Sequence, residues 1–475
     1  MNPRRSVVAL VACSLLLSCH DSTSTFGDQQ RLLAVNGSTF PVVRLGDTVV
    51  IEGSGFGSAQ ANGSVLFGTG TSNVPAPVIS WTDDQLLVSV PSGATSGLIV
   101  VSPDTGSAVG PIPVLISPPA VAFSPATFNW IAGPALPVGL RAVQLSALTY
   151  PSDTGLTARL HATAGSNDTT VQLTTLFSSL TGAGPAAWVQ GADPLPTAYV
   201  HSASATATQS RARLRRHPNR DSTVEGVSYL LGGMDGGGRV VSDVSGMSVW
   251  ENGDEGAWTR LTALPEPRAA SAAAVAYGNL YVVGGFGPDS IALASTRIAV
   301  IDSFGAPTGW IDGPPLPEGR AFAATVIHNH VMYLIGGETG HIDPSLPDTL
   351  AMRPDVFAIR LSPLTGFFVD AGWFATVPLS GPRSRHAAFD VDAGILVSVG
   401  LTASGAPESE FASFTPDGSL NAFAPLTAPT IASLAGSSIS EVGYASYTDH
   451  LGLPHVVLVG GVTASGGLSS QVWWH

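Results

Sequence analysis

Short apolar runs separated by clusters of glycine, proline, serine and aspartate recur along the chain from about residue 33 onwards. In the first part of this region the runs are Val49–Glu52, Ser64–Phe67, Val78–Trp81, Leu86–Val90, Leu98–Val101 and Ile112–Ile116. Runs of this length between turn residues are typical of β-strands, whereas amphipathic helices need longer stretches with a period of about 3.6 residues. The pattern therefore predicts an all-β protein that begins, over residues 33–118, with a small two-sheet β-sandwich.

A different pattern governs residues 119–475, where apolar strand endings followed by a glycine pair recur. The pairs are Gly232-Gly233, Gly284-Gly285, Gly336-Gly337 and Gly460-Gly461, with weaker copies at Ala164-Gly165 and Val399-Gly400. The spacing is 52 residues both from Gly232 to Gly284 and from Gly284 to Gly336. Aromatic residues recur in the same phase, at Trp130, Trp188, Trp258, Trp310, Trp373 and Phe423. A four-stranded sheet cannot bury both of its faces alone, so the six copies predict a six-bladed β-propeller.

The repeat also predicts where its marker residues lie and how the ring closes. We expect the glycine pairs where neighbouring blades approach closely, and the tryptophans packed between blades. Residues 121–130 look like the fourth strand of a blade, and residues 470–475 look like a third strand. Pairing of these two segments in the sixth blade would join the ends of the array and remove a free sheet edge.

Composition supports the all-β interpretation and narrows the choice of partners. The 475 residues include 54 Gly and 36 Pro but only 11% charged residues, which favours short strands and turns over long helices. All 20 basic residues are arginine, and the formal net charge is -14. Nucleic acid is a poor partner for so acidic a chain, because phosphates repel it.

The N-terminus has the pattern of an export signal over residues 1–18. Arg4 and Arg5 precede a short apolar run, which ends in Leu16-Leu17-Ser18-Cys19. This ending resembles the lipobox of bacterial lipoproteins, in which the cysteine becomes the lipid-modified first residue of the mature chain. The resemblance implies a membrane anchor at Cys19 and a polar tether over residues 19–32. An ordinary secretory signal with a chance cysteine is the alternative.

The same resemblance bears on location and on thiol chemistry. His20 follows Cys19 where an aspartate would, in many enteric bacteria, retain a lipoprotein in the inner membrane. We therefore expect an outer-membrane lipoprotein of the bacterial cell envelope, either periplasmic or surface-exposed. The other cysteine, Cys13, lies within the signal, so no free thiol would remain for a disulfide or a nucleophile.

Residues 33–118 resemble the IPT/TIG family of immunoglobulin-like domains. The resemblance rests on Gly46 to Gly57, on Val65-Leu66-Phe67-Gly68, and on Trp81 to Pro91. Within the first of these segments, the glycines of Gly53-Ser54-Gly55-Phe56-Gly57 predict a tight corner with Phe56 in the core. In bacterial members such domains usually act as spacers or adhesion modules, which implies no chemistry of their own.

The remainder resembles the Kelch repeat, which combines Leu-Pro-x-x-Arg, Tyr-x-x-Gly-Gly and Trp. One full copy runs through Leu264-Pro265, Arg268, Tyr281, Gly284-Gly285 and Trp310. In several Kelch propellers that arginine lines one mouth of the central channel. Position by position, the resemblance implies channel-mouth sites at Arg268, Arg320 and Arg383, with Arg141 one residue late, Tyr199 and His201 in blade two, and Thr430 in blade six.

Two interpretations of these arginines follow from their chemistry. Fixed guanidinium groups around a concave mouth suit a carboxylate or phosphate ligand. Alternatively, each arginine pairs with a nearby carboxylate, such as Glu266 or Glu318, and only supports its loop. Strand alternation places Arg385 on the same face as Arg383, and we expect His386 to be a packed histidine rather than a general base.

Other clusters indicate less. Arg211, Arg213, Arg215, Arg216 and Arg220 lie between two predicted strands of blade two. They predict either contact with anionic lipid or lipopolysaccharide phosphate, or a solvated loop. His328 and His330 at a predicted hairpin tip are too few for a zinc site, and the insertion from His341 to Asp348 lacks calcium-loop spacing. We therefore expect neither a metal nor a cofactor.

Three functional hypotheses remain open at this stage. The first is a lipid-anchored binding protein whose propeller recognises a glycan, peptide or protein at the channel mouth. The second is a carbohydrate-active Kelch enzyme, such as one similar to sialic acid mutarotases, although no acid–base pair stands out. A copper-radical oxidase resembling galactose oxidase needs a tyrosine cross-linked to cysteine, which the mature chain would lack. The third is a structural component of the envelope or of an adhesion complex.

Overall fold

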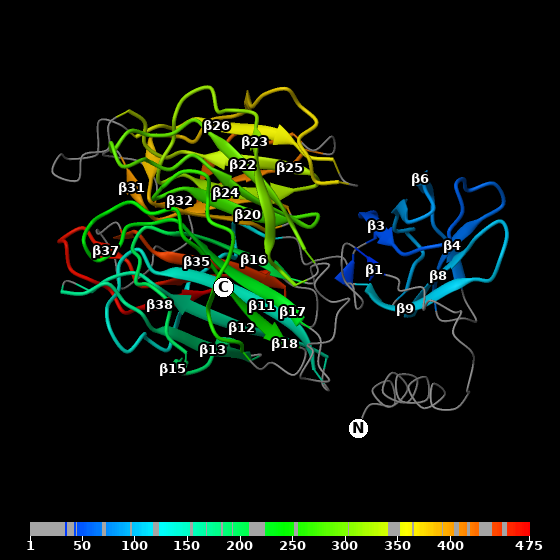
Figure 1. Ribbon diagram of the computed structural model, residues 1–475, viewed down its shortest axis with the longest axis horizontal. Coiled ribbons are helices and arrows are strands. Elements are labelled where there is room, and N and C mark those ends of the chain that lie inside the picture. The colour runs from blue at the N-terminus through cyan, green and yellow to red at the C-terminus, as the bar shows by residue number, and fades with distance from the viewer. Residues whose placement is uncertain are drawn as a thin grey trace.

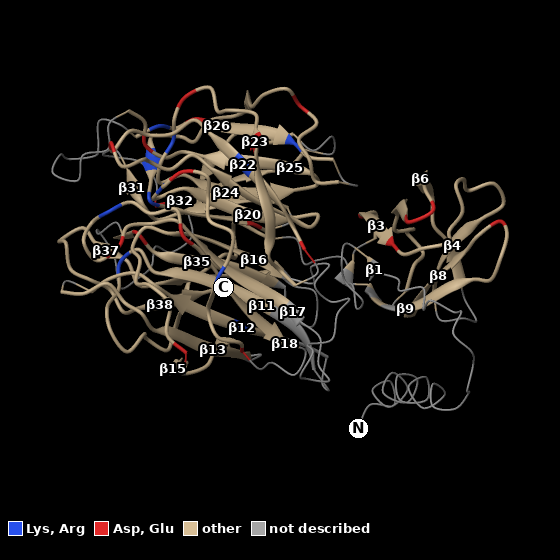
Figure 2. Ribbon diagram, viewed as in Figure 1, with Lys and Arg blue, Asp and Glu red and all other residues tan. Residues whose placement is uncertain are grey.

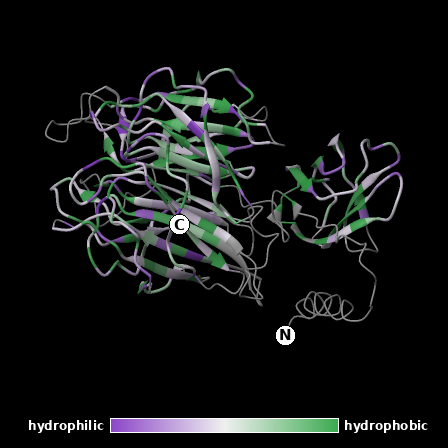
Figure 3. Ribbon diagram, in the orientation of Figure 1, coloured by the Kyte–Doolittle hydropathy of each residue, from purple (hydrophilic) through white to green (hydrophobic). Residues whose placement is uncertain are grey.

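The structure is a computed structural model in which every regular element of the described residues is a β-strand (Figure 1). The described residues are 34–35, 42–43, 45–68, 73–95, 97–116, 123–152, 155–167, 169–181, 184–191, 193–208, 224–250, 255–302, 304–340, 352–362, 365–391, 393–402, 408–415, 419–426, 439–448 and 454–475. Hydrophobic residues concentrate on the strands, and charged residues are sparse on the ribbon (Figures 2 and 3). Over the described part of the chain, no helix has the length and apolarity needed to cross a membrane.

The N-terminal domain is the predicted two-sheet sandwich. One sheet has the order β1 (Ala34–Val35), β3 (Thr48–Glu52), β7 (Gln85–Ser89), β6 (Val78–Trp81). The other has the order β2 (Val42–Val43), β9 (Val109–Ile116), β8 (Gly97–Ser102), β4 (Ser64–Gly68), β5 (Asn73–Pro75). Phe56 is fully buried in the core between them, and its carbonyl accepts a hydrogen bond from the indole of Trp81 at 3.1 Å. The corner predicted from the glycines therefore does hold Phe56 in the core.

Six sheets with four main strands each follow, one for each copy of the repeat. Blade 1 contains β11 (Gln144–Ser152), β12 (Gly155–Thr163), β13 (Thr175–Thr181) and β15 (Val189–Gln190), with β14 (Gly184–Pro185) also on β13. Blade 2 contains β16 (Ala203–Thr208), β17 (Val224–Leu231), β18 (Val244–Trp250) and β19 (Thr259–Arg260). Blade 3 contains β20 (Ala272–Ala276), β21 (Asn279–Val283), β22 (Thr296–Ile301) and β23 (Pro307–Gly313).

The other three blades have the same plan. Blade 4 contains β24 (Ala324–His328), β25 (Val331–Ile335), β26 (Val356–Arg360) and β27 (Phe374–Ala375). Blade 5 contains β29 (Ala387–Asp390), β30 (Gly394–Ser398), β32 (Ser409–Ser413) and β33 (Ala424–Pro425). Blade 6 contains β35 (Gly443–Thr448), β36 (Pro454–Val459), β38 (Val472–Trp474) and β10 (Ile131–Gly133). Two short strand pairs adjoin blades 5 and 6. They are β28 (Arg383–Ser384) with β31 (Leu401–Thr402), and β34 (Ile439–Ser440) with β37 (Val462–Thr463).

The first strands of the blades form a closed circle. Each first strand contacts the first strand of the next blade, in the order β11, β16, β20, β24, β29 and β35, and β35 contacts β11 again. The predicted six-bladed propeller is therefore confirmed.

The ends of the repeat array meet in blade 6, as the sequence predicts. Ile131 pairs with Trp474 and Gly133 with Val472, while β38 also pairs with β36. The pairing strand begins at Ile131, immediately after the segment 121–130 expected to form it. Trp473 of β38 is 2% exposed, so the closure is also a packed hydrophobic contact.

A closed circle of backbone hydrogen bonds links each blade to the next, and we call it the glycine circle. Its donors are the N–H groups of the second residue of each pair, and its acceptors are carbonyls of the following blade. The six bonds are Gly165 to Tyr199, Gly233 to Arg268, Gly285 to Arg320, Gly337 to Arg383, Gly400 to Ile439 and Gly461 to Leu140, with N···O distances of 2.6–3.0 Å.

Geometry explains why the second residue of each pair is always glycine. The six φ angles lie between 86° and 109°, which L-residues rarely adopt. A Cβ at these positions would lie 2.6–2.9 Å from a carbonyl oxygen of the same blade. The first residue of the pair has φ near 60°, which Ala164 (60°) and Val399 (56°) also adopt in the two weaker copies.

The tryptophans lie between blades, as predicted. Trp188 donates its indole N–H to the Pro134 carbonyl at 3.0 Å, and Trp373 donates to the Pro314 carbonyl at 3.1 Å. Trp258 donates to the Thr175 hydroxyl at 2.8 Å. Each bond crosses from one blade to the preceding blade, so the indole anchors the outer part of the interface while the glycine circle anchors the inner part.

Substitution of Gly285 by alanine tests the glycine circle. We expect Gly285→Ala to lower the free energy of unfolding by roughly 2–4 kcal/mol, because φ is 92° and the new Cβ meets the Ala269 carbonyl at 2.7 Å. Chemical denaturation of the purified chain measures this loss. Gly236→Ala is the matched control, since no atom lies within 4 Å of its Cβ position. Equal stability of the two variants would contradict the argument.

Candidate functional site

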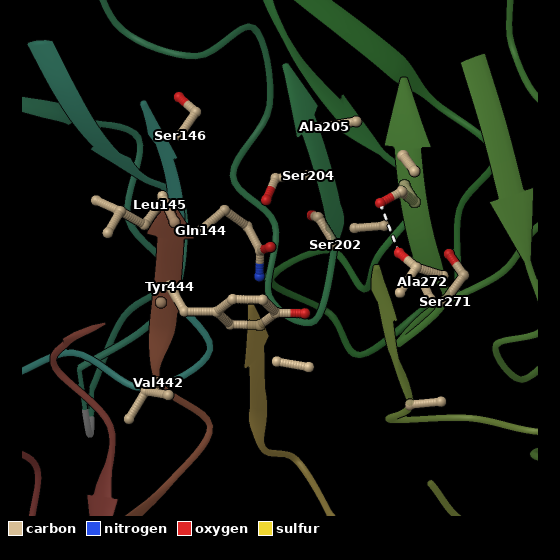
Figure 4. A pocket seen from close by; sticks show the side chains of 18 of the residues that line it. Gln144, Leu145, Ser146, Ser202, Ser204, Ala205, Ser271, Ala272, Val442 and Tyr444 are labelled. Carbon is tan, nitrogen blue, oxygen red and sulfur yellow. Dashed lines mark hydrogen bonds between the residues drawn. The ribbon is translucent and has the colours of Figure 1, made fainter. Parts of the chain in front are cut away.

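The six innermost strands surround a cavity of about 430 Å³ (Figure 4). Its wall consists mostly of alanines and of uncharged polar side chains, because six strands converge there and leave little room. The lining residues with hydroxyl or amide groups are Gln144, Ser146, Ser202, Ser204, Thr206, Ser271, Thr325, Tyr444 and Ser446, and the lining residues with ionisable groups are His201, Arg385, His386, Asp390 and Glu441. Tyr444 of β35 and Gln144 of β11 extend into the space, and Ser204 of β16 and Ser202 just before that strand lie close to them (Figure 4).

One residue from each blade forms the rim of this cavity, and we call this set the mouth ring. The six residues are Ala142, His201, Ala270, Phe322, Arg385 and Glu441, all with left-handed φ angles of 50–55°. Backbone N–H groups of the ring donate to carbonyls of the preceding blade, as from Phe322 to Ala270 at 2.9 Å and from Arg385 to Phe322 at 3.0 Å. Backbone hydrogen bonds between neighbouring blades therefore hold the rim residues in place.

One half of the rim is ionic. Glu441 accepts hydrogen bonds from Nε and one terminal nitrogen of Arg141 at 2.8 and 3.0 Å, and from Arg385 at 2.7 Å. Arg385 also donates to Glu338 at 3.1 Å, and the Ser384 hydroxyl donates to Glu338 at 2.7 Å. Burial by itself would raise the pKa of Glu441, but the charge that His201 carries when protonated in acid and the charges of Arg385 and Arg141 outweigh this effect and lower that pKa to about 2.

The other half is apolar and aromatic. The guanidinium of Arg385 lies 4.1 Å from the ring centre of Phe322, as a cation–π contact. His201 meets Phe322 edge-on, with their ring centres 5.3 Å apart, and the ring centre of Phe286 lies 5.9 Å from that of Phe322. Burial lowers the pKa of His201 to about 4, so this ring is neutral near pH 7. The rim thus offers an apolar surface opposite a hydrogen-bonding one.

The arginines expected at the mouth lie elsewhere. Arg268, Arg320 and Arg383 are fully buried or 1% exposed, and none of them lines the cavity. Arg268 pairs with Glu266 and donates to the Gly284 carbonyl, while Arg320 pairs with Glu318 at 2.8 Å. Arg383 donates to the Val399 carbonyl. The alternative of structural pairing therefore describes these three, because the chain reaches the rim only two residues later.

Of the remaining predicted residues, some lie at the mouth ring and one lies away from the cavity. Tyr199 is buried and donates its hydroxyl to Asp243 at 2.5 Å, away from the cavity. His201 and Arg385 belong to the mouth ring, and Arg141 reaches it through Glu441. The expectation that Arg383 and Arg385 share one face is corrected, since the left-handed Arg385 (φ 54°) interrupts the strand between β28 and β29.

Sequence reasoning missed several rim and wall residues. Phe322 follows Arg320 by two residues, and Ala270 follows Arg268 in the same way, so the offset is visible in the repeat. Glu441 and Tyr444 lie in the sixth copy, whose repeat signals are weak. Glu338 follows the glycine pair of blade 4 and carried no motif of its own.

The histidines singled out from the sequence lie in different places. His386 is 4% exposed and lines the cavity, and neither of its ring nitrogens has a hydrogen-bond partner within the described residues. His328 lies 2.9 Å from Asp390 and stacks on Phe414, and His330 contacts the Tyr277 hydroxyl. The described part of the chain holds no group of three or more His, Cys, Asp or Glu residues placed to bind a metal.

Several predictions concern residues outside those that the structure describes. They include Cys19, the tether, the arginines between Arg211 and Arg220, the insertion from His341 to Asp348, and Thr430.

The buried histidines predict a loss of stability in acid. Burial, with a smaller contribution from Arg383, lowers the pKa of His386 to about 3. In the unfolded chain the pKa of this histidine is about 6.5, so as the pH falls below that value the unfolded chain binds a proton that the folded chain does not. The free energy of unfolding therefore has its full value above about pH 6.5 and declines below it. Urea denaturation at several pH values should show the decline. His386→Leu should reduce its slope by about 1.4 kcal/mol per pH unit, and an unchanged slope would refute the assignment.

Comparisons with known proteins match one domain family and find several similar proteins. Residues 33–117 match the IPT/TIG domain. Beta-scruin of Limulus polyphemus is 31% identical over 113 residues, and alpha-scruin of the same organism is 30% identical over 121 residues. These matches cover 23% and 25% of this chain but only 12% of each scruin.

A solved structure of YjhT is similar at 15% identity with a TM-score of 0.48, covering 71% of this chain and 95% of YjhT. The domain match identifies residues 33–117 as an immunoglobulin-like IPT/TIG domain, and the six four-stranded sheets that follow it are consistent with a Kelch propeller.

Proposed function

We propose that this protein is a non-enzymatic binding protein of the bacterial cell envelope whose propeller takes a ligand into the mouth of its channel. The observation that carries the proposal is the mouth ring, which holds an apolar surface opposite a hydrogen-bonding one above a cavity of about 430 Å³. Cavities of roughly 300–1,000 Å³ are typical of small-ligand sites. A glycan, or the end of a peptide or protein loop, fits such an opening.

The rigidity of the rim supports binding. Backbone hydrogen bonds between blades hold its residues, as from Ala270 to His201 at 2.7 Å and from Glu441 to Arg385 at 3.2 Å. A preformed site loses little conformational entropy when a ligand arrives, so more of the contact energy appears as affinity.

The acidities of the rim groups favour binding over acid–base catalysis. A general acid or base works best when its pKa lies near the working pH. The pKa of Glu441 is about 2 and that of His201 is about 4, so both groups keep one protonation state near neutral pH. Both are already held in contacts with neighbouring side chains.

Blocking the channel tests the proposal. Ser204 lies on the cavity wall, and Ser204→Trp places an indole in the space. We expect glycan or peptide ligands, found by screening arrays with the purified chain, to lose at least about tenfold in affinity. Ser465→Trp is the matched control, since Ser465 is exposed in a turn of blade 6. The proposal would be overturned if neither a glycan array nor a peptide array yields a ligand, or if Ser204→Trp leaves the affinity of the ligands unchanged.

The proposal includes the lipid anchor at Cys19. It is supported by the charged start, the short apolar run and the Leu-Leu-Ser-Cys ending of the first nineteen residues. In a bacterial host fed a labelled fatty acid, we expect label on the natural chain and none on Cys19→Ser, because lipid attachment begins at that thiol. Cys13→Ser serves as the control and should keep the label. Equal labelling of natural chain and Cys19→Ser would exclude the anchor.

A further inference from the structure

We infer that the ligand group entering the mouth ring is an uncharged sugar unit, not an acidic or basic one. The inference rests on the proposed binding function and narrows it to a ligand class. Three observations support it. The charges at the rim balance, separating the buried ion pairs costs free energy, and the cavity wall below the rim carries uncharged hydrogen-bonding groups.

Charges at the rim cancel. Arg141 and Arg385 face Glu441 and Glu338, and the N···O distances of the ion pairs between them are 2.7–3.1 Å. Deeper in the cavity, Asp390 lies 2.9 Å from His328. The arrangement therefore contains no surplus of positive charge to attract a carboxylate or a phosphate.

Displacing the ion pairs of Arg385 is costly because both partners are largely buried, whereas the Arg141 side chain is 39% exposed. The Glu441 side chain is 5% exposed and the Glu338 side chain is fully buried. Arg385 is engaged on three sides, by Glu338, by Glu441 and by the face of Phe322. An anionic ligand would have to separate a guanidinium from a carboxylate that cannot regain water, and breaking a buried pair in this way is strongly unfavourable.

The interior offers uncharged hydrogen-bonding groups instead. Gln144, Ser204, Thr206 and Tyr444 line the cavity from three different blades. Burial raises the pKa of Tyr444 to about 12, so its hydroxyl stays protonated and can both donate and accept. The hydroxyl groups of a sugar match such a mixture of donors and acceptors.

The apolar half of the rim suits the other side of a sugar ring. Phe322 and the neutral His201 meet edge-on at 5.3 Å, and Ala270 lies next to them in the mouth ring. Sugar rings carry C–H groups on their faces, which pack on apolar and aromatic surfaces, while their hydroxyl edges turn to polar groups.

Four sugars with one ring skeleton and different charge test the inference on the intact chain. Glucose and N-acetylglucosamine are uncharged, glucuronic acid is an anion, and glucosamine is a cation. Saturation-transfer NMR with titration should show binding of at least one uncharged sugar, and weaker binding of both ions by at least about tenfold. Equal or tighter binding of an ion overturns the inference but supports the proposed function.

Failure of the inference and failure of the proposed function remain distinct. If none of the four sugars binds, the uncharged-sugar inference is wrong. Ligands that are found on the arrays and lost in Ser204→Trp would still uphold a binding function for the channel.

A change of one charge adds a direct test. Glu441→Gln leaves Arg141 and Arg385 with one carboxylate fewer, so we expect binding of glucuronic acid to rise at least about tenfold. Glu318→Gln is the matched control, because Glu318 pairs with Arg320 and Arg353 outside the cavity. No gain with Glu441→Gln contradicts the inference. If that variant does not fold, as a thermal melt would show, the four sugars on the unaltered chain decide the matter.

Discussion

The propeller depends on the glycine circle, six backbone hydrogen bonds that join each blade to the next and return to the first. The circle requires backbone to approach backbone at φ angles near 90°, with no space for a Cβ. Because the bonds lie near the axis, where six strands converge, they set the spacing of the innermost strands. The indoles of Trp188, Trp258 and Trp373 then fix the outer part of the same interfaces.

The binding site follows from this constraint. Each chain segment that accepts a bond of the glycine circle turns into a left-handed residue two positions later, and these six residues form the mouth ring. The rim is therefore as rigid as the propeller. Its specificity comes from the residue that each blade places there: alanine in two blades, and His201, Phe322, Arg385 and Glu441 in the others.

Burial decides between two roles for the arginines. Arg268, Arg320 and Arg383 recur with the repeat because each satisfies carbonyls and carboxylates inside its own blade. Arg385 has the same chemistry but lies on the rim, where it bridges Glu338 and Glu441 over the face of Phe322. A repeated residue thus supports the scaffold, and the residue that departs from the repeat shapes the site.

The sequence by itself determined the all-β class, the sandwich, the number of blades and the closing pair of strands. These follow from local periodicity, from turn residues and from glycine positions, which act over a few residues or at a fixed spacing. Only the tertiary structure decided which side chains meet at the mouth. Glu441 and Arg141 are 300 residues apart in the chain and join at 2.8 Å, a contact that depends on ring closure and on no local pattern.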